Sequence, residues 1–241
     1  MTNNRITNII RSLEDHSVKS KPGNRKSSPS ILDILIATKL SQNTTDKTSY
    51  KAFKNLKENF KTWEELIDTP LQKVKNAIKI CGLANTKARQ IKLMLKEMKR
   101  KYGNLNLSFL KKMDNEKIYE ELLHYEGIGV KTVSCVLAFS LDRDVFPVDT
   151  HVHRVLNRLE IVNTKTAEQT FEIASKKISK EKQTAFHTNL IKFGRNICKA
   201  NKPLCKLCFL YLYCGYEYKN LYKDKTSSIK KENNFIILEN V

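Results

Sequence analysis

Glycine, proline and long apolar runs are scarce in this chain of 241 residues. The 7 glycines and 5 prolines are too few for the many turns of an all-β protein. No apolar stretch approaches the roughly 20 residues of a membrane-spanning helix. Charges at Arg5, Arg11, Glu14 and Asp15 interrupt the apolar core that a secretory signal would need. These absences exclude an all-β fold and a membrane span, and we expect a cytoplasmic protein.

Acidic residues are also under-represented. The chain has 44 Lys plus Arg against 25 Asp plus Glu, a formal net charge of +19 and a pI near 9.6. This excess predicts a polyanionic partner, with nucleic acid as the first candidate and a merely basic surface as the alternative. We expect no membrane partner. The protein is expected in the cytoplasm, associated with the nucleoid through DNA, or in the nucleus if the source is eukaryotic.

Helical periodicity takes the place of turns. Apolar residues recur at spacings of three and four through most of the chain, as in Ile31, Ile34 and Leu35. The pattern predicts an all-α protein. Residues 224–241 begin with a Lys-, Ser- and Asn-rich stretch that predicts a mobile basic tail, although the apolar residues 235–238 suit a docking segment.

Four of the six cysteines gather near the C-terminus: Cys198, Cys205, Cys208 and Cys214. Intervals of six, two and five residues put four soft ligands on one short segment, enough to hold an iron–sulfur cube or a tetrahedral zinc. The spacing favours the cube, because four-thiolate zinc sites usually pair two C-x-x-C knuckles and only one is present. Four unrelated buried or disulfide-bonded cysteines are the alternative. Cys81 and Cys135 are expected to be small buried hydrophobes.

A glycine-containing turn, His-Tyr-Glu-Gly-Ile-Gly-Val-Lys-Thr, joins two helical patterns between His124 and Thr132. Gly127 and Gly129 permit positive φ and leave no Cβ in the way, so N–H groups at the start of the second helix can meet a phosphate directly. The turn therefore predicts a helical hairpin that grips DNA. A G-x-G sequence alone is weak evidence, and an ordinary helix–helix turn is the competing interpretation.

A second motif, Phe-Pro-Val-Asp-Thr-His-Val-His-Arg-Val, occupies residues 146–155. With both motifs and the cysteines in this order, the chain from about Ser28 to Tyr216 resembles the endonuclease III family of DNA glycosylases. The turn resembles the family's helix-hairpin-helix motif, Val148-Asp149-Thr150-His151 matches its second signature, and the cysteines have its iron–sulfur spacing. The cofactor that the resemblance implies is one 4Fe-4S cluster.

The resemblance implies two catalytic residues. Lys131 matches the family's nucleophilic lysine, which attacks the anomeric carbon of a damaged nucleoside, and we expect burial and the positive end of the following helix to favour its neutral amine. Asp149 matches the catalytic carboxylate, which stabilises oxocarbenium-like charge and assists proton transfer. Each has a structural alternative, because Lys131 is one of 44 basic residues and Asp149 is well placed to cap a helix. We interpret His151 and His153 as structural or DNA-facing residues, not metal ligands.

Two loops are expected to open the duplex, since an enzyme of this class flips its nucleotide out and must fill the gap. Leu83 resembles the family's apolar wedge, with an ordinary packing contact after a glycine as the alternative. The family's plugging glutamine falls at Asn43, with Gln42 one residue early, so either amide suits the role. Glu126 and Val130 stand where many relatives have proline and arginine, and Glu126 either weakens the phosphate grip or points into solvent.

The resemblance also implies an all-α helix-hairpin-helix glycosylase fold with two domains. A six-helix barrel domain would span 28–143, an iron–sulfur cluster domain would combine 1–26 with 144–223, and the DNA cleft would lie between them. The residues expected to contact DNA are Gln42, Asn43, Leu83, Gly127, Gly129, Lys199 and Lys202.

We therefore expect a bifunctional DNA glycosylase with apurinic/apyrimidinic (AP) lyase activity. It would act as a monomer in base excision repair, excise oxidised pyrimidines from damaged double-stranded DNA and nick the strand by β-elimination. The alternatives are a related glycosylase for another damaged or mismatched base and a non-catalytic iron–sulfur module that binds DNA. Lys131 argues against most related glycosylases for other bases, because single-function relatives lack that lysine. The presence of both Lys131 and Asp149 argues against a non-catalytic module.

Overall fold

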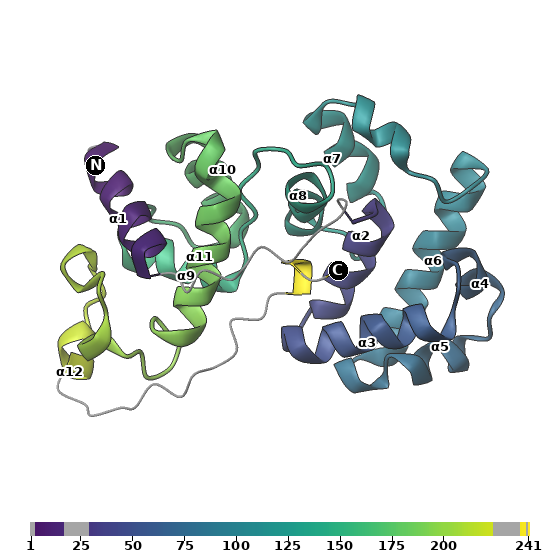
Figure 1. The fold of residues 1–241 in the computed structure, drawn as a ribbon, viewed down its shortest axis with the longest axis horizontal. Helices are drawn as coiled ribbons and strands as arrows, with labels where there is room; N and C mark the ends of the chain where they lie inside the picture. Colours follow the sequence, from purple (N-terminus) through teal and green to yellow (C-terminus); the bar gives the residue numbers. More distant parts are fainter. Residues whose placement is uncertain (1–2, 17–28, 224–236, 240) are drawn as a thin grey trace. The chain divides into compact units, whose positions relative to one another are not determined.

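The computed structural model describes residues 3–16, 29–223, 237–239 and 241. Every regular element in these residues is a helix, so the predicted all-α class is confirmed. Contacts divide the chain into two units, which Figure 1 shows coloured along the sequence. Unit 1 comprises Met1–Lys21 and Asp144–Asn234, and unit 2 comprises Pro22–Arg143 and Phe235–Val241. Among the described residues, no helix has both the length and the apolar character needed to cross a membrane.

Unit 2 contains α2 (Ile31–Ser41), α3 (Asp46–Asn59), α4 (Trp63–Asp68), α5 (Leu71–Ala77), η1 (Lys79–Cys81), α6 (Ala84–Tyr102), η2 (Ser108–Lys112), α7 (Asn115–Leu123), α8 (Val130–Phe139) and η6 (Ile237–Glu239). Its central helix is α2, which contacts α3, α6, α8 and η6. Ser30 caps the N-terminus by accepting a hydrogen bond from the Asp33 N–H at 3.1 Å. Because α2 is apolar on nearly every side, it is buried on nearly every side.

The C-terminal end of the chain packs on unit 2. Ile237 and Leu238 are buried, and η6 contacts α2, α3 and α8. The Ile237 N–H donates to Asp46 Oδ2 at 3.0 Å, at the start of α3. Of the predicted basic tail, residues 224–236 lie outside the described residues. Ile237 and Leu238 form the docking segment that the sequence suggested for residues 235–238, because their apolar side chains are buried beside α2.

Unit 1 contains α1 (Asn3–His16), α9 (Thr150–Arg158), α10 (Ala167–Lys177), η3 (Lys180–Lys182), α11 (Gln183–Asn196), η4 (Cys205–Leu207), η5 (Tyr211–Tyr213) and α12 (Lys219–Lys223). The helix α11 contacts both α1 and α9. In α9 the buried residues Val152, Val155 and Leu156 form a stripe at helical spacing, which leaves the polar face of α9 for the cysteine segment.

Candidate active site and cysteine pocket

The turn between α7 and α8 is anchored by apolar residues and left open at its tip. Tyr125 and Ile128 are buried, and the Ile128 N–H donates to the Tyr125 carbonyl at 3.0 Å. Only Gly127, with φ of +77°, uses the left-handed conformation that both glycines permit. Gly129 is extended because it is the N-cap residue of α8. Its side chain supplies no cap, and a Cβ there would meet nothing within 4 Å, so the start of α8 is open to an anion.

Glu126 is exposed but paired. Its Oε1 accepts hydrogen bonds from Gln90 Nε2 at 3.0 Å and from Arg89 Nη2 at 2.8 Å, both on α6. The bond from Gln90 and the positive charge of Arg89 lower the pKa of the Glu126 carboxyl. The acid is therefore held against α6 with its charge partly offset, an arrangement that neither sequence-based alternative anticipated.

Lys131 is the second residue of α8, and it is exposed. The burial predicted for this lysine is wrong for the DNA-free protein. The reason lies in the orientation of α8: the residues after Lys131, from Thr132 to Phe139, face the core of unit 2, which turns the first residues of the helix outward. An exposed amine at an open helix N-terminus is free to meet a substrate.

Asp149 is the N-cap residue of α9 in unit 1 and is partly buried. Its Oδ1 accepts hydrogen bonds from the N–H groups of His151 and Val152, both at 2.8 Å. The capping role is confirmed, and it fixes the orientation of the carboxylate. His153 lies 2.7 Å from Thr170 Oγ1 through Nδ1, and His151 Nδ1 lies 3.2 Å from Arg154 Nη2, so both imidazoles take part in polar contacts within unit 1.

The loops after α2 and η1 have strained, exposed tips. Leu83 is 60% exposed and lies in the left-handed region at φ of +47°, which is unfavourable for a bulky residue. Asn43 is exposed with φ of +54°. Gln42, in contrast, donates from Nε2 to the Gly127 carbonyl at 3.3 Å. The structure thus ties Gln42 to the hairpin and leaves Asn43 at the tip of its loop.

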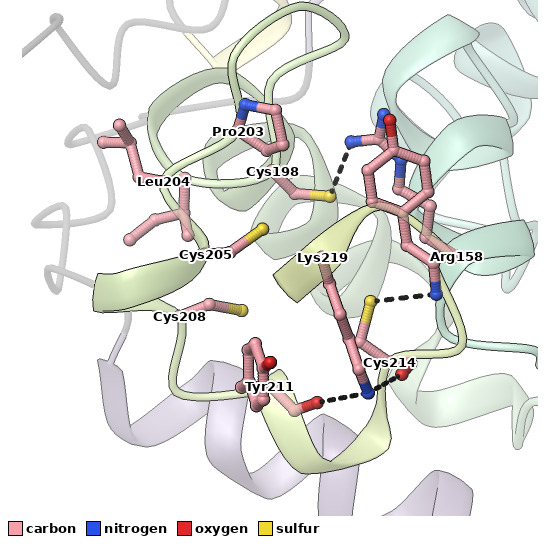
Figure 2. A pocket seen from close by; sticks show the side chains of 11 residues that line it. Arg158, Cys198, Pro203, Leu204, Cys205, Cys208, Tyr211, Cys214 and Lys219 are labelled. Carbon is pink, nitrogen blue, oxygen red and sulfur yellow. Dashed lines mark hydrogen bonds between the residues drawn. The ribbon is translucent and has the colours of Figure 1, made fainter. Parts of the chain in front are cut away.

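All four clustered cysteines line one pocket of unit 1, shown in Figure 2, with an empty volume of about 290 Å³. The full lining is Arg158, Ile197, Cys198, Pro203, Leu204, Cys205, Cys208, Tyr211, Cys214, Tyr216 and Lys219. None of the six cysteines forms a disulfide, so the disulfide alternative is wrong. Among the described residues, no group of three or more His, Cys, Asp or Glu side chains is arranged to hold a single metal ion.

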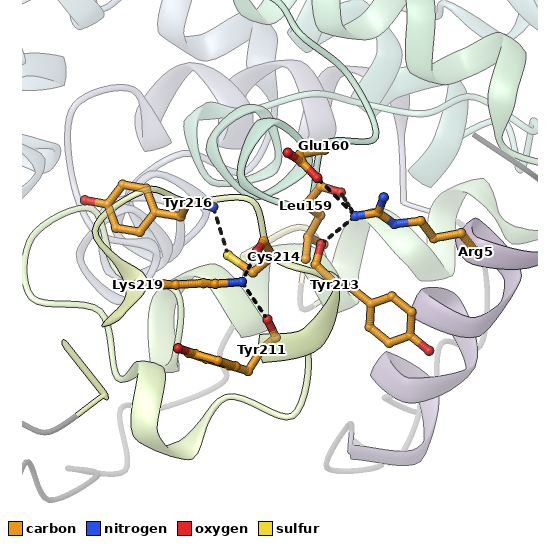
Figure 3. Close-up of polar contacts among 8 residues, drawn as sticks. All are labelled: Arg5, Leu159, Glu160, Tyr211, Tyr213, Cys214, Tyr216 and Lys219. Atoms are coloured by element: carbon orange, nitrogen blue, oxygen red, sulfur yellow. Dashed lines mark hydrogen bonds and ion pairs between the residues drawn. The ribbon is translucent and has the colours of Figure 1, made fainter. Parts of the chain in front are cut away.

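Donors face the sulfur atoms of this pocket. Arg158 Nη1 lies 3.4 Å from Cys198 Sγ (Figure 2), and the Tyr216 backbone nitrogen lies 3.4 Å from Cys214 Sγ (Figure 3). Such donors stabilise negatively charged sulfur. Burial raises the pKa of Cys208 to about 12 and also raises those of Cys205 and Cys214. Burial therefore favours the neutral thiol at these three positions, and a thiolate there needs a positively charged partner.

Backbone carbonyls of the cysteine segment accept hydrogen bonds from side chains of the first and last helices of unit 1, α1 and α12. Figure 3 shows Arg5 Nη2 of α1 donating to the Tyr213 carbonyl at 2.8 Å and to the Leu159 carbonyl at 3.3 Å, with Glu160 paired to the same group. Lys219 donates to the carbonyls of Cys214 and Tyr211. The segment is thus held in place by side-chain donors from two separate elements, α1 and α12.

Of the two lysines predicted beside this segment, Lys199 is partly buried, and its carbonyl accepts a hydrogen bond from Arg158 Nη1 at 2.8 Å. Lys202 is exposed at a backbone turn with φ of +55°.

The sequence did not single out Arg158, although its spacing of four from Arg154 on α9 was a usable signal. It also missed the buried lysines Lys39 and Lys87, because periodicity does not reveal that a helix is covered on its polar side.

Comparison with known proteins agrees with this geometry. Residues 36–180 match the family model described as HhH-GPD superfamily base excision DNA repair protein. Endonuclease III of Thermotoga maritima is 35% identical over 208 residues, which cover 86% of this chain and 93% of that protein.

Two solved structures are similar over almost the whole chain. A non-covalent endonuclease III–DNA complex superposes with a TM-score of 0.76 at 28% identity and covers 92% of this chain and 99% of its own. A trapped endonuclease III–DNA covalent intermediate gives 0.77 at 27% identity with the same coverage. The chain belongs to the HhH-GPD superfamily of base excision DNA repair proteins and, within it, to the endonuclease III family.

Proposed function

We propose that this DNA glycosylase/AP lyase excises oxidised pyrimidines from duplex DNA and then nicks the strand by β-elimination. The observation that carries the proposal is an exposed lysine, Lys131, in the first turn of a helix whose N-terminus is open to an anion. A non-catalytic DNA-binding module needs the open helix N-terminus but has no use for a nucleophile beside it. The matched endonuclease III, named as an enzyme of DNA cleavage, supports the same reaction class.

Lys131 is the proposed nucleophile. Its Nζ attacks the anomeric carbon, the base leaves, and the sugar is held as a Schiff base from which β-elimination nicks the strand. The attack needs a neutral amine. Lys131 is exposed in the free protein, so the proposal relies on bound DNA to exclude water from the amine.

Asp149 is the proposed carboxylate partner. Capping of α9 by Oδ1 holds the side chain rigid, so that the carboxylate can stabilise the positive charge that develops on the sugar without reorganising. It can also assist proton transfer from Lys131.

The remaining contacts of the proposal hold and open the duplex. Gly127 and Gly129 leave the start of α8 accessible to a phosphate, and Lys199 and Lys202 add positive charge beside the cysteine segment. Leu83 is the proposed wedge, since an exposed leucine in a strained conformation gains nothing from packing. Asn43 is the proposed plug, because Gln42 is already bonded to the hairpin.

Cys198, Cys205, Cys208 and Cys214 are the proposed ligands of a 4Fe-4S cluster. Cys198, Cys205, Cys208 and Cys214 line one space as free thiols, and N–H groups of Arg158 and Tyr216 point at sulfur. When bound, the cluster would crosslink the segment covalently, in place of a hydrophobic core. The four cysteines would then hold the basic loop around Lys202 in one conformation.

A duplex panel tests the proposal. The purified protein is incubated with duplexes that each carry one damaged or mismatched base, and base release is separated from strand cleavage. We expect release of thymine glycol and related oxidised pyrimidines with concurrent nicking, and a permanent protein–DNA crosslink when borohydride reduces the imine. Base release without nicking or crosslinking would assign a single-function glycosylase, and binding without release would assign a non-catalytic module.

The proposed enzyme acts as a monomer on nucleoid or nuclear DNA, because both proposed catalytic residues, Lys131 and Asp149, belong to one chain. Light scattering of the protein with and without a short duplex tests this. A mass of two chains per duplex would contradict it.

A further inference from the structure

Three exposed loops of unit 2 reverse direction through left-handed residues. These are Asn43 at φ of +54°, Leu83 at +47° and Gly127 at +77°. Two of the three are not glycine, so their backbones are strained and must be held by their surroundings. The loops follow different helices in the sequence, yet hydrogen bonds connect all of them to the C-terminal end of α2.

Two buried lysines make those connections. Lys39 Nζ donates to the Gly127 carbonyl at 3.0 Å, so it links α2 to the hairpin. Lys87 Nζ, from α6, donates to the Leu40 carbonyl at 2.8 Å and to the Cys81 carbonyl at 3.0 Å. Leu40 leads into the loop of Asn43, and Cys81 precedes Gly82 and Leu83. Lys39 therefore fixes the turn of the hairpin, and Lys87 fixes the backbone at the bases of the other two loops.

Both side chains are almost inaccessible, at 3% exposure for Lys39 and 2% for Lys87. Burial lowers the pKa of each, and the charge of Glu126 raises that of Lys39 in part. Buried ammonium groups cost stability unless their donors are satisfied, and the carbonyls of Leu40 and Cys81, at the ends of α2 and η1, are favourable partners for Lys87. An apolar side chain would fill each of these buried positions without the cost of burying a charge. We therefore assign the role of both lysines to their hydrogen bonds with backbone carbonyls.

Gly127 is shaped to receive Lys39. A Cβ at position 127 would lie 1.8 Å from Lys39 Nζ, so the ammonium occupies the space that any other residue would fill. Gln42 Nε2 adds a second donor to the same carbonyl. The hairpin, the plug loop and the wedge loop thus share one hydrogen-bonded base.

We propose that Lys39 and Lys87 are positioning residues that fix the hairpin, the Asn43 loop and the Leu83 loop relative to one another for duplex opening. The proposal rests on the function proposed above, because that function assigns these loops to DNA. In it, neither lysine touches the nucleotide. Their contribution is to hold the phosphate-binding turn, the plug and the wedge at one fixed spacing, so that all three engage the duplex together.

Lys92 offers a matched control. It lies on α6, like Lys87, and its Nζ donates to the carbonyls of Leu66, Ile67 and Thr69 at the end of α4 and just beyond it, away from the three loops. Burial lowers its pKa as well. Lys39→Met, Lys87→Met and Lys92→Met each remove a lysine bonded to backbone carbonyls, but only the first two release the loops.

The test compares single-turnover excision of thymine glycol in duplex and in single-stranded oligonucleotides, with folding checked by thermal melting. We expect Lys39→Met and Lys87→Met to lower the duplex-to-single-strand rate ratio by between about tenfold and about a hundredfold, the effect of misplacing groups by about 1 Å. Lys92→Met should leave the ratio unchanged even if it melts earlier. Lys39→Gln, which keeps an N–H donor, should recover part of the loss.

Equal ratios in wild type, Lys39→Met and Lys87→Met would overturn the proposal and leave the lysines as purely structural groups. If Lys87→Met does not fold, Lys87→Arg, which keeps the charge but displaces the donor, takes its place and should also lower the ratio. Failure of the wild-type protein to excise any base would instead refute the proposed function, so the two failures are distinguishable.

Discussion

Lys131 and Asp149 carry separable parts of the proposed reaction. Lys131→Gln should abolish both borohydride crosslinking and β-elimination, because no imine forms without the amine. Asp149→Asn should lower excision of an intact damaged base by about 10²- to 10³-fold, as loss of a group that stabilises developing charge does, yet still allow slow trapping of a preformed abasic site. Single-turnover excision and crosslinking on a thymine glycol duplex measure both. Undiminished crosslinking by folded Lys131→Gln protein would contradict the assignment of the nucleophile.

The two hairpin glycines should respond differently to alanine. Gly127→Ala should cost about 1–3 kcal/mol of folding free energy, since it forces a Cβ into a left-handed residue and against Lys39. Gly129→Ala should leave the free energy of unfolding nearly unchanged, because its backbone is extended and its Cβ would meet open space. It should nevertheless weaken DNA binding, because that Cβ would intrude where the phosphate is proposed to lie. Unfolding curves and titration with undamaged duplex check the pair, and normal binding by Gly129→Ala would place the phosphate elsewhere.

Sequence motifs predict local backbone geometry well and side-chain environments poorly. The left-handed backbone of Gly127 and the N-cap at Asp149 follow from two short motifs. The exposure of Lys131 depends on which face of α8 meets the core, and the pairing of Glu126 depends on residues 36 and 37 positions away. Long-range contacts of this kind leave no trace in a local pattern.

At the scale of elements, α2 shows both the reach and the limit of periodicity. Its apolar run predicts a helix from Ile31, and the Ser30 cap and the burial of the helix agree. Nothing in the run indicates that Lys39 is covered, since a lysine among apolar residues also suits the one exposed edge of such a helix. Only the packing of α6 and the hairpin around the end of α2 reveals the shared base of the three loops.

The wedge loop gives a prediction in which stability and activity separate. Leu83→Gly should preserve or slightly raise the free energy of unfolding, by up to about 1–2 kcal/mol, because it relieves a left-handed leucine that is 60% exposed. Excision from paired damage should fall far more than excision from single strands, where no helix must be opened. Chemical denaturation and single-turnover assays test both. A marked loss of stability would favour the packing interpretation of Leu83.

At the scale of the whole molecule, the net charge of +19 should dominate binding to undamaged duplex. Log K should fall linearly with log salt, with a slope of about −0.9 for each phosphate neutralised. Lys202→Ala should reduce that slope by at most about one such unit, whereas Lys54→Ala, an exposed lysine paired with Glu58 on α3, should not change it. Fluorescence anisotropy at several salt concentrations gives the slopes, and a slope near zero for the wild type would assign the basic surface to another partner.

The cluster prediction also concerns the whole molecule, because a cofactor bound by unit 1 replaces core packing there. Purified protein should be brown and contain about four irons per chain, as a cubane held by four thiolates requires. Cys208→Ser should lose iron and unfold at lower temperature, since this residue lines the pocket together with Cys205 and is a proposed ligand. Cys135→Ala removes a buried thiol of α8 in unit 2 and should keep full iron content. Iron analysis, visible absorbance and melting of the three proteins decide the matter. Zinc in place of iron in anaerobically prepared protein would assign the pocket to a different metal, and full iron content in Cys208→Ser would remove that residue from the ligand set.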